Sequence, residues 1–295
     1  MESAITNQVR EKILAAITEN RKNYPTDVSH AVALGINKTT YSTLKGGNVD
    51  KKIKDGDWIQ IARKLGVEFG NAREWKVART PTFEYIYSQL DKCRLGSLSA
   101  MFCDLPNIGK TTTARYYARR NPHTVYVDCS QVKTLQRLIR YIAQEFGVKS
   151  NGRYADVYAD LVYYLRTLDR PLIILDEAGD LRNEAFLELK ALWNATEYCC
   201  GWYMMGADGF KAKLERGVFN EILGCTEMRS RYGDKYNRST PVDSKEREAF
   251  FFAQAEMIAT ANAPQGTNIG KTVRESGGSL RRTYTLIAKQ NTEQA

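Results

Sequence analysis

Residues 97–118 contain the residue types that a phosphate-binding loop needs, in the order in which it needs them. An apolar run ends at Cys103, a loop containing Gly109 follows, and Lys110 and Thr111 then open a helix-forming segment. A strand, a glycine-bearing loop, Lys-Thr and a helix are typical of a P-loop. The unpaired N–H groups of such a loop and of the first helical turn converge on one point, and the helix dipole favours an anion there.

This loop predicts a site for ATP and Mg²⁺. We expect Lys110 to contact the β- and γ-phosphates and the Thr111 hydroxyl to bind Mg²⁺. Asp104 departs from the pattern, because a P-loop has glycine five residues before Gly109 and electrostatics does not favour an acid beside phosphate. The sequence leaves Asp104 unexplained. We expect backbone groups to form the phosphate cradle, and the predicted nucleotide-binding residues are Asn107, Ile108, Gly109, Lys110, Thr111, Thr112 and Asp176.

A second apolar run, residues 171–175, ends in Asp176 and Glu177. The carboxyl end of a buried strand is where a Walker-B acid orients Mg²⁺, and ligands of α/β sheets bind at that edge. We expect Asp176 to bind Mg²⁺ together with Thr111, and Glu177 to polarise the attacking water. Two acids at a strand end are common on any surface. Their position after a second predicted strand, 66 residues beyond Lys110, favours the nucleotide site.

The remaining residue types exclude several other functions. The six cysteines show no C-x-x-C spacing, which indicates free thiols in a reducing compartment. The two histidines, His30 and His123, are too few for a histidine-rich metal site or a histidine-based triad. No apolar run approaches the ~20 residues of a membrane span and the start lacks a signal-peptide pattern, so we expect a cytoplasmic protein.

The elements that must position these residues predict an α/β fold. Apolar strand-like segments alternate with helical segments over residues 81–240, which predicts a parallel sheet covered by helices on both faces. Residues 241–295 show helical patterns only and are expected to form a small helical lid. Residues 268–272 repeat the NIGKT of the P-loop, but no buried strand precedes them, so we interpret them as a lid loop. Residues 71–80 are polar and read as a linker.

Residues 1–70 predict short helices with a helix-turn-helix. Thr26 and Asn37 are expected to N-cap two helices joined by a Gly-Ile-Asn turn, and the stretch resembles phage-repressor helix-turn-helix domains. Residues 1–80 hold 14 Lys/Arg and 9 Asp/Glu, a net +5 out of +9 for the whole chain, which favours nucleic acid. A helical bundle for protein contacts is the alternative. The second helix would bury Tyr41 and Leu44 in part and present the predicted DNA-binding residues Lys38, Thr39, Thr40, Ser42 and Lys45.

The order of motifs resembles that of the AAA+ ATPases. GKTT, ILDEAGDL, GWYMMGADGF, the cluster Arg229-Ser230-Arg231 and the segment Gly278-Ser279-Leu280-Arg281 follow in that order. With the N-terminal helix-turn-helix, nearly the whole chain is similar to the phage Mu B transposition protein family. That resemblance implies an ATP-dependent regulator that forms a homo-oligomer, as a helical filament on double-stranded target DNA, and activates a transposase.

The resemblance also implies residue roles. Lys110 and Glu177 would be catalytic, Arg231 or Arg229 an arginine finger for a neighbouring subunit, and Arg281 the lid's sensor arginine, with Arg282 as the alternative. Asp208 would be the strand sensor, because Ala207 stands where a polar residue is usual. Two alternatives stay open: a helicase-loader ATPase, and a helix-turn-helix repressor whose ATPase core is degenerate, which Asp104 and Ala207 would favour.

Overall fold

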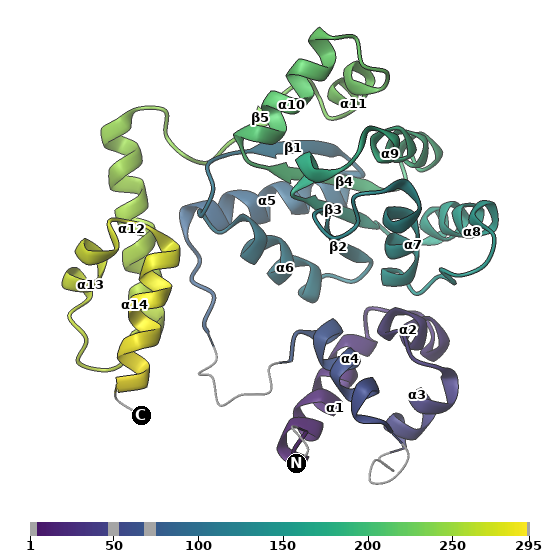
Figure 1. Ribbon diagram of the computed structural model, residues 1–295, viewed down its shortest axis with the longest axis horizontal. Helices are drawn as coiled ribbons and strands as arrows, with labels where there is room; N and C mark the ends of the chain where they lie inside the picture. Colours follow the sequence, from purple (N-terminus) through teal and green to yellow (C-terminus); the bar gives the residue numbers. More distant parts are fainter. Residues whose placement is uncertain (1–4, 47–52, 68–74, 294–295) are drawn as a thin grey trace.

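The computed structural model describes residues 5–46, 53–67 and 75–293, which form an N-terminal group of helices, a central α/β part and a C-terminal group of helices (Figure 1). In the described part of the chain, no helix is both long enough and apolar enough to cross a membrane.

The N-terminal helices are α1 Asn7–Arg21, α2 Asp27–Leu34, α3 Lys38–Lys45 and α4 Asp55–Leu65. Their starts follow from local capping: the Thr26 side chain accepts from the Ser29 N–H, and Asn37 Oδ1 accepts from the Thr40 N–H over 2.8 Å. α1 packs against α4 around Ile13 and Trp58, both fully buried. Two short capped helices thus stand on a small apolar core, as a helix-turn-helix requires.

The central part contains one parallel sheet of five described strands, in the order β2-β3-β4-β1-β5. The strands are β1 Ser99–Cys103, β2 Thr124–Asp128, β3 Leu172–Asp176, β4 Gly201–Gly206 and β5 Tyr236–Asn237. Cys103 is level with Gly206 across β1 and β4, and Leu175 is level with Met204 across β3 and β4. The carboxyl ends of β1 and β3 therefore meet at one sheet edge.

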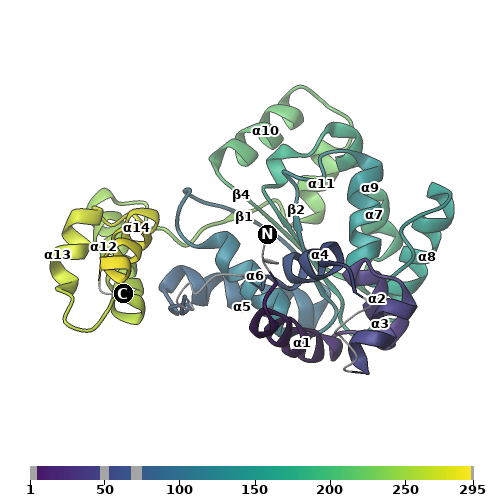
Figure 2. The same ribbon diagram turned by 60° about the horizontal axis from the view of Figure 1, so that its bottom comes forward.

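Helices cover both faces of this sheet, as predicted (Figures 1 and 2). α5 Pro81–Gly96 and α6 Lys110–Arg120 pack on one face against Phe102 and Ile174, and the other face, with Val127 and Leu175, lies under the remaining helices. These are α7 Leu135–Glu145, α8 Tyr154–Thr167, α9 Asn183–Ala195, α10 Asp208–Phe219 and α11 Cys225–Arg231, with a 3₁₀ turn at Ala178–Asp180. Side chains that alternate along each strand supply the two cores.

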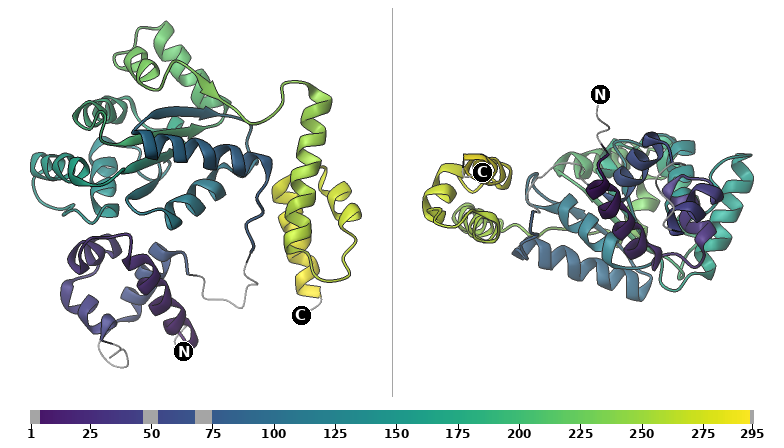
Figure 3. Two further views of the ribbon diagram at one scale, coloured as in Figure 1. Left: turned by 180° about the vertical axis from the view of Figure 1, so that it is seen from behind. Right: turned by 90° about the horizontal axis from the view of Figure 1, so that it is seen from below.

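The C-terminal helices stand to one side of the α/β part (Figure 3). They are α12 Ser244–Asn262, α13 Ile269–Ser276 and α14 Leu280–Glu293. Ala255, Ala259, Val273 and Ile287 form their shared core. The prediction of a loop at residues 268–272 was wrong, because Asn268 Oδ1 accepts from the Lys271 N–H over 2.9 Å and so starts α13.

Candidate nucleotide-binding site

The loop of residues 104–109 joins β1 to α6 at the carboxyl edge of the sheet. Gly109 precedes α6 with φ 96°, a left-handed conformation that favours glycine. The Lys110 side chain turns back into the loop, where Nζ donates to the carbonyl oxygens of Asp104 over 2.9 Å and Leu105 over 2.7 Å. Burial lowers the pKa of Lys110, while the acids around it act in the other direction. A buried positive charge thus lies inside the loop.

Thr111 and Asp176 are in direct contact. Thr111 Oγ1 donates to Asp176 Oδ2 over 2.7 Å, and the hydroxyl of Tyr126 on β2 donates to the same oxygen over 3.0 Å. Asp176 Oδ1 accepts from the Glu177 N–H over 2.9 Å. Tyr126 was not predicted as a site residue, because its neighbours in the sequence mark it only as part of a buried strand.

The Thr111 hydroxyl and the Asp176 carboxylate suit an Mg²⁺ ion whose other ligands are phosphates and water. They are too few to hold a metal ion without such ligands. A hydroxyl and a carboxylate oxygen are the ligands that Mg²⁺ takes from proteins when phosphates and water complete its shell. Among residues 5–46, 53–67 and 75–293, no three His, Cys, Asp or Glu side chains gather into a metal-holding group. Thr111 and Asp176 therefore fit a metal that arrives with a nucleotide.

Glu177 follows β3 in a left-handed conformation with φ 50° and is exposed. Burial of its carboxyl group and then the charge of Asp176 raise the pKa of Glu177, while Lys110 acts to lower it. A glutamate with a raised pKa beside a phosphate-binding loop is a suitable general base. Of the two adjacent acids, one is thus tied into the sheet edge and the other faces the pocket.

A cavity of about 540 Å³ opens at this edge, between the P-loop and the C-terminal helices. Glu177 and Arg281 line it, and so do Asn107 and the residues from Gly109 to Thr112. Ile108 is instead buried in the core beneath the loop. Predicted residues from the P-loop, the start of α6, the end of β3 and the lid are thus brought to one cavity, whereas Asp176 reaches its edge only through Thr111.

Aromatic side chains form an apolar wall of this cavity. Trp75, Phe83 and Tyr284 line it, and the rings of Trp75 and Tyr284 meet edge to face with centroids 4.7 Å apart. An aromatic wall next to a phosphate-binding loop suits a nucleobase. The predicted linker ends in these described residues, with the Lys76 N–H donating to Asn262 Oδ1 over 2.7 Å. An isolated tryptophan in a polar stretch was the only sequence signal for this wall.

Asp104 points away from the cavity. Its carboxylate is 1% exposed and accepts hydrogen bonds from residues 239 and 240, which lie between β5 and α12. Burial acts to raise the pKa of Asp104, but the hydrogen bonds from Thr240, Ser239 and Leu105 outweigh it and leave the pKa lowered. The acid that the sequence left unexplained does not face the phosphate cradle.

The predicted sensor residues divide between the cavity and the surface. Arg281, on the first turn of α14, lines the cavity, and Arg282 is not among its lining residues. Ala207 also lines it, whereas Asp208 begins α10 and is exposed.

The two candidate finger arginines lie on α11 and do not line the cavity of their own chain. Arg229 Nε pairs with Asp234 Oδ1 over 2.9 Å. Arg231 Nε donates to Asn194 Oδ1 over 2.9 Å, and its guanidinium lies over the Trp193 ring. Both side chains thus have partners within their own chain.

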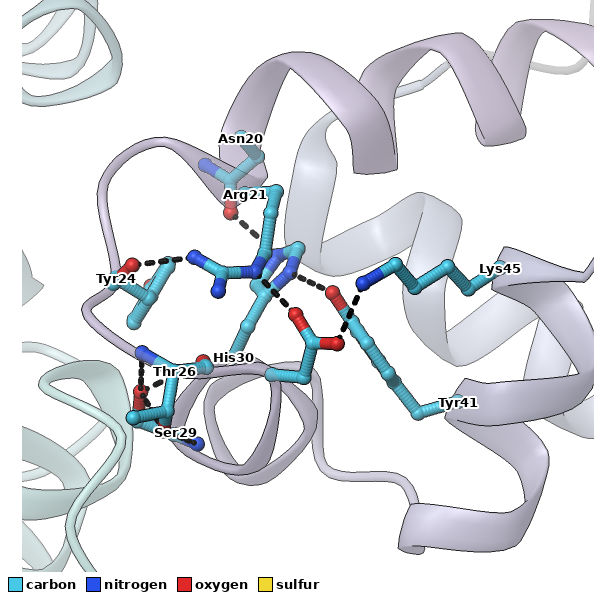
Figure 4. Close-up of polar contacts among 9 residues, drawn as sticks. Asn20, Arg21, Tyr24, Thr26, Ser29, His30, Tyr41 and Lys45 are labelled. Atoms are coloured by element: carbon cyan, nitrogen blue, oxygen red, sulfur yellow. Dashed lines mark hydrogen bonds and ion pairs between the residues drawn. The ribbon is translucent and has the colours of Figure 1, made fainter.

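The candidate DNA-binding helix α3 buries Tyr41 and Leu44 more fully than expected, and it exposes four of its five predicted contact residues. Lys38, Thr39, Ser42 and Lys45 are exposed, and Thr40 is half-buried. Lys45 Nζ lies 2.7 Å from Asp27 Oδ2, and Asp27 also pairs with Arg21 over 2.6 Å (Figure 4). The basic face of α3 thus carries one lysine already paired with an acid of α2.

A buried histidine connects α3 to the rest of the N-terminal helices (Figure 4). His30 Nε2 lies 3.0 Å from Asn20 Oδ1, an oxygen that can only accept, so Nε2 carries the proton. Nδ1 then accepts from the Tyr41 hydroxyl over 2.8 Å. Burial, and then the charge of Arg21, lower the pKa of His30 to about 4.

The N-terminal helices contact the α/β part through α2 and α7. The Tyr24 hydroxyl donates to the Glu145 carbonyl oxygen over 3.1 Å, and Lys64 forms an ion pair with the Glu145 side chain. A second cavity of about 640 Å³ lies between the two parts, away from the P-loop. α3 extends from the other side of α2, where its exposed face is open (Figure 1).

Comparisons with known proteins agree with this geometry. A family model described as an AAA domain matches residues 99–214, which run from β1 through the P-loop and the Asp176 strand into α10. The Mu-like prophage FluMu DNA transposition protein B of Haemophilus influenzae is 22% identical over 252 residues, which cover 84% of this chain and 85% of that protein.

A solved structure has a similar fold. The Aeropyrum pernix Orc1 protein, determined in complex with DNA, superposes with a TM-score of 0.52 at 20% identity. The match covers 72% of this chain and 59% of that chain, so this chain spans less than two thirds of the Orc1 length. The P-loop, the acid-tipped strand and these matches are consistent with an AAA+ ATPase of the Mu transposition protein B type.

Proposed function

We propose that this chain is an ATP-dependent DNA-binding ATPase that assembles as a homo-oligomer on double-stranded DNA and regulates a transposase. One observation carries the ATPase part: Lys110, Glu177 and Arg281, from three separate segments, line one cavity beside the Thr111–Asp176 contact. The name of the Haemophilus relative, a DNA transposition protein, supports the transposase part.

The residues of the cavity have complementary roles in ATP hydrolysis. Lys110 and the N–H groups from Asn107 to Thr112 hold the phosphates, and Thr111 and Asp176 hold Mg²⁺. Bound there, Mg²⁺ neutralises charge that develops on the phosphate oxygens. Glu177 orients the attacking water and accepts its proton, which its raised pKa favours. Arg281 adds positive charge from the lid, and the aromatic wall holds the base.

The arginines of α11 support an oligomeric enzyme. Arg229 and Arg231 lie outside the cavity of their own chain. An arginine finger supplied by a neighbouring subunit raises the rate of NTP hydrolysis by about 10³–10⁵ in other NTPases. We infer that α11 contacts the nucleotide of a neighbour in the DNA-bound assembly.

The exposed face of α3 supports DNA binding. Lysines and short hydroxyl side chains on a helix after a tight turn suit phosphates and base edges in the major groove. The net charge of residues 1–80, +5 from 14 Lys/Arg and 9 Asp/Glu, adds a general attraction to DNA.

ATP hydrolysis measured with and without duplex DNA tests the proposal. The Lys110→Ala variant should lose ATP binding and ATP-dependent assembly on DNA, whereas the wild type should hydrolyse ATP faster with DNA. Lys271→Ala is the matched control, because Lys271 belongs to the second NIGKT segment and is exposed on α13. Unchanged ATP-dependent DNA binding in Lys110→Ala would overturn the proposal.

The partner is tested separately. Purified transposase should show faster strand transfer when the wild-type chain and ATP are present, and not with Lys110→Ala. An active DNA-stimulated ATPase without that effect would instead indicate a helicase loader. Negligible hydrolysis together with a defined operator sequence would indicate a repressor.

A further inference from the structure

Asp104 connects the P-loop to the segment that leads into the lid. Its Oδ2 accepts from the Ser239 N–H over 2.7 Å, the Thr240 N–H over 2.9 Å and the Ser239 hydroxyl over 3.1 Å. Its Oδ1 accepts from the Thr240 hydroxyl and, over 2.8 Å, from the Leu105 N–H. Four of these five donors belong to two residues that lie just before α12.

Asn107 makes a second connection from the same loop to the lid. Its φ of 62° is left-handed, and its side chain points to the start of α14. Asn107 Oδ1 accepts from the Arg281 N–H over 3.0 Å, and Nδ2 donates to Ser279 Oγ over 2.9 Å. The P-loop thus holds the lid both where the chain enters it and at its last helix.

The Asp104 contacts account for an acid at the position where a P-loop has glycine. A glycine at position 104 has no side-chain acceptor, so it would leave the N–H groups of half-buried Ser239 and buried Thr240 without their partner. Five hydrogen-bond donors stabilise the Asp104 carboxylate. They hold it facing away from the proposed phosphate site, although the residue lies in the same loop. The same residue also accepts from Lys110 Nζ through its carbonyl oxygen.

We propose that Asp104 and Asn107 are positioning residues that clamp the lid to the P-loop, so that Arg281 and Tyr284 are held against the nucleotide. The clamp rests on the proposed nucleotide site. It makes a specific prediction: replacing Asp104 by the glycine that P-loops normally have weakens ATP binding. The weakening arises from the lid, so it affects the contacts of Arg281 and Tyr284 with the nucleotide and spares the contacts of the P-loop with the phosphates.

Calorimetric titration of the full chain with ATP and with inorganic tripolyphosphate tests the clamp. Asp104→Gly and Asp104→Asn should raise the Kd for ATP about tenfold or more, since charged hydrogen bonds are lost. The Kd for tripolyphosphate should change less than the Kd for ATP, because tripolyphosphate has no base and loses only the contact with Arg281. Asp160→Asn, an exposed acid on α8, is the control. An Asp104→Gly variant that binds ATP as tightly as the wild type would overturn the proposal.

A variant of a partner of Asp104, Thr240→Val, and a variant of the second connection, Asn107→Gly, guard against a general folding defect. Thr240→Val removes only a hydroxyl donor, and Asn107→Gly keeps the left-handed backbone while removing both side-chain contacts. Each should raise the Kd for ATP, and Thr240→Val should add little to Asp104→Asn, because the two changes remove one interaction. Full additivity of these two variants would contradict the clamp.

Hydrogen exchange without nucleotide separates the clamp from the proposed function. In Asp104→Asn, the amides of residues 239–240 and of the first turn of α14 should exchange faster than in the wild type, and those of α8 should not. Unchanged exchange at these amides would overturn the clamp even in a protein that binds ATP. A wild type that binds neither ATP nor tripolyphosphate would instead refute the proposed function, and the exchange result would still decide the clamp.

Discussion

The Thr111 hydroxyl donates a 2.7 Å hydrogen bond to Asp176 Oδ2 across two strands of the sheet. Because β4 separates β1 from β3, this contact is possible only where the carboxyl ends of these strands are level. Tyr126 Oη holds the same Asp176 oxygen from β2. The pair is therefore oriented by the sheet before any metal binds.

Thr111→Ala should weaken the affinity for Mg²⁺ in ATP binding, because it removes one of the two oxygen ligands that we propose. The Mg²⁺ concentration for half-maximal ATP binding should rise about tenfold, at the lower end of the effect of altered metal surroundings. Thr111→Ser keeps the hydroxyl and should have the Mg²⁺ midpoint of the wild type. An unchanged Mg²⁺ midpoint in Thr111→Ala would show that Thr111 is not a ligand.

Glu177→Gln should slow hydrolysis strongly and leave ATP binding intact. Losing a general base lowers the rate by roughly 10²–10⁴-fold, while the amide keeps the size of the side chain. Single-turnover hydrolysis and ATP titration measure the two effects. Glu184→Gln on α9 is the control, since Glu184 is exposed outside the cavity.

The same residue predicts the pH dependence of hydrolysis. A base must be deprotonated to accept a proton, so the rate falls as pH falls through the pKa of Glu177. Because that pKa is raised, the decline should begin above the ~4.3 of an ordinary glutamate. Rates that stay constant down to pH 4.3 in wild type would show that Glu177 is not the base.

His30 should make the N-terminal helices less stable in mild acid. Its pKa of about 4 lies below the ~6.5 of an unfolded histidine, so the unfolded chain binds the extra proton between these values. The contribution of neutral His30 to the free energy of unfolding is therefore fully present above pH 6.5. It decreases as pH falls towards 4, by about 3 kcal/mol in total. Hydrogen exchange of α1 and α3 amides in the full chain measures this decrease.

The neutral variant His30→Gln is the matched control for this pH effect. Glutamine retains a donor and an acceptor for Asn20 and Tyr41 but carries no charge in this range. The protection of α1 and α3 amides in His30→Gln should be nearly independent of pH between 4 and 6.5, once the intrinsic pH dependence of amide exchange is subtracted. A wild type that shows the same flat profile would contradict the assignment.

The sequence predicts those parts of the site in which each functional residue is next, along the chain, to the strand or helix that positions it. Lys110 and Thr111 open α6 directly after the loop that follows β1, and Asp176 ends its own strand. The α/β fold with helices on both faces was confirmed, because each strand is a continuous apolar run.

The parts that could not be predicted depend on contacts between distant segments. Four of the five donors to Asp104 come from residues 135 and 136 positions away, so the neighbouring sequence does not show what the acid does. The wall of Trp75 and Tyr284 also forms only when the lid is in place. β5 has two residues and α11 has seven, which is too short for a periodic pattern.

Asp27 should reduce the affinity of the protein for DNA. It pairs with Lys45 on the exposed face of α3 and with Arg21 on α1, which neutralises charge that would otherwise face phosphate. Asp27→Asn should therefore increase affinity for duplex DNA of any sequence and steepen its salt dependence.

Lys45→Ala should weaken binding across sequences and reduce the slope of log K against log salt by about one. Fluorescence anisotropy at several salt concentrations measures both, with Lys92→Ala, an exposed lysine on α5, as the control. Equal effects of Lys45→Ala and Lys92→Ala would show that α3 does not face the DNA.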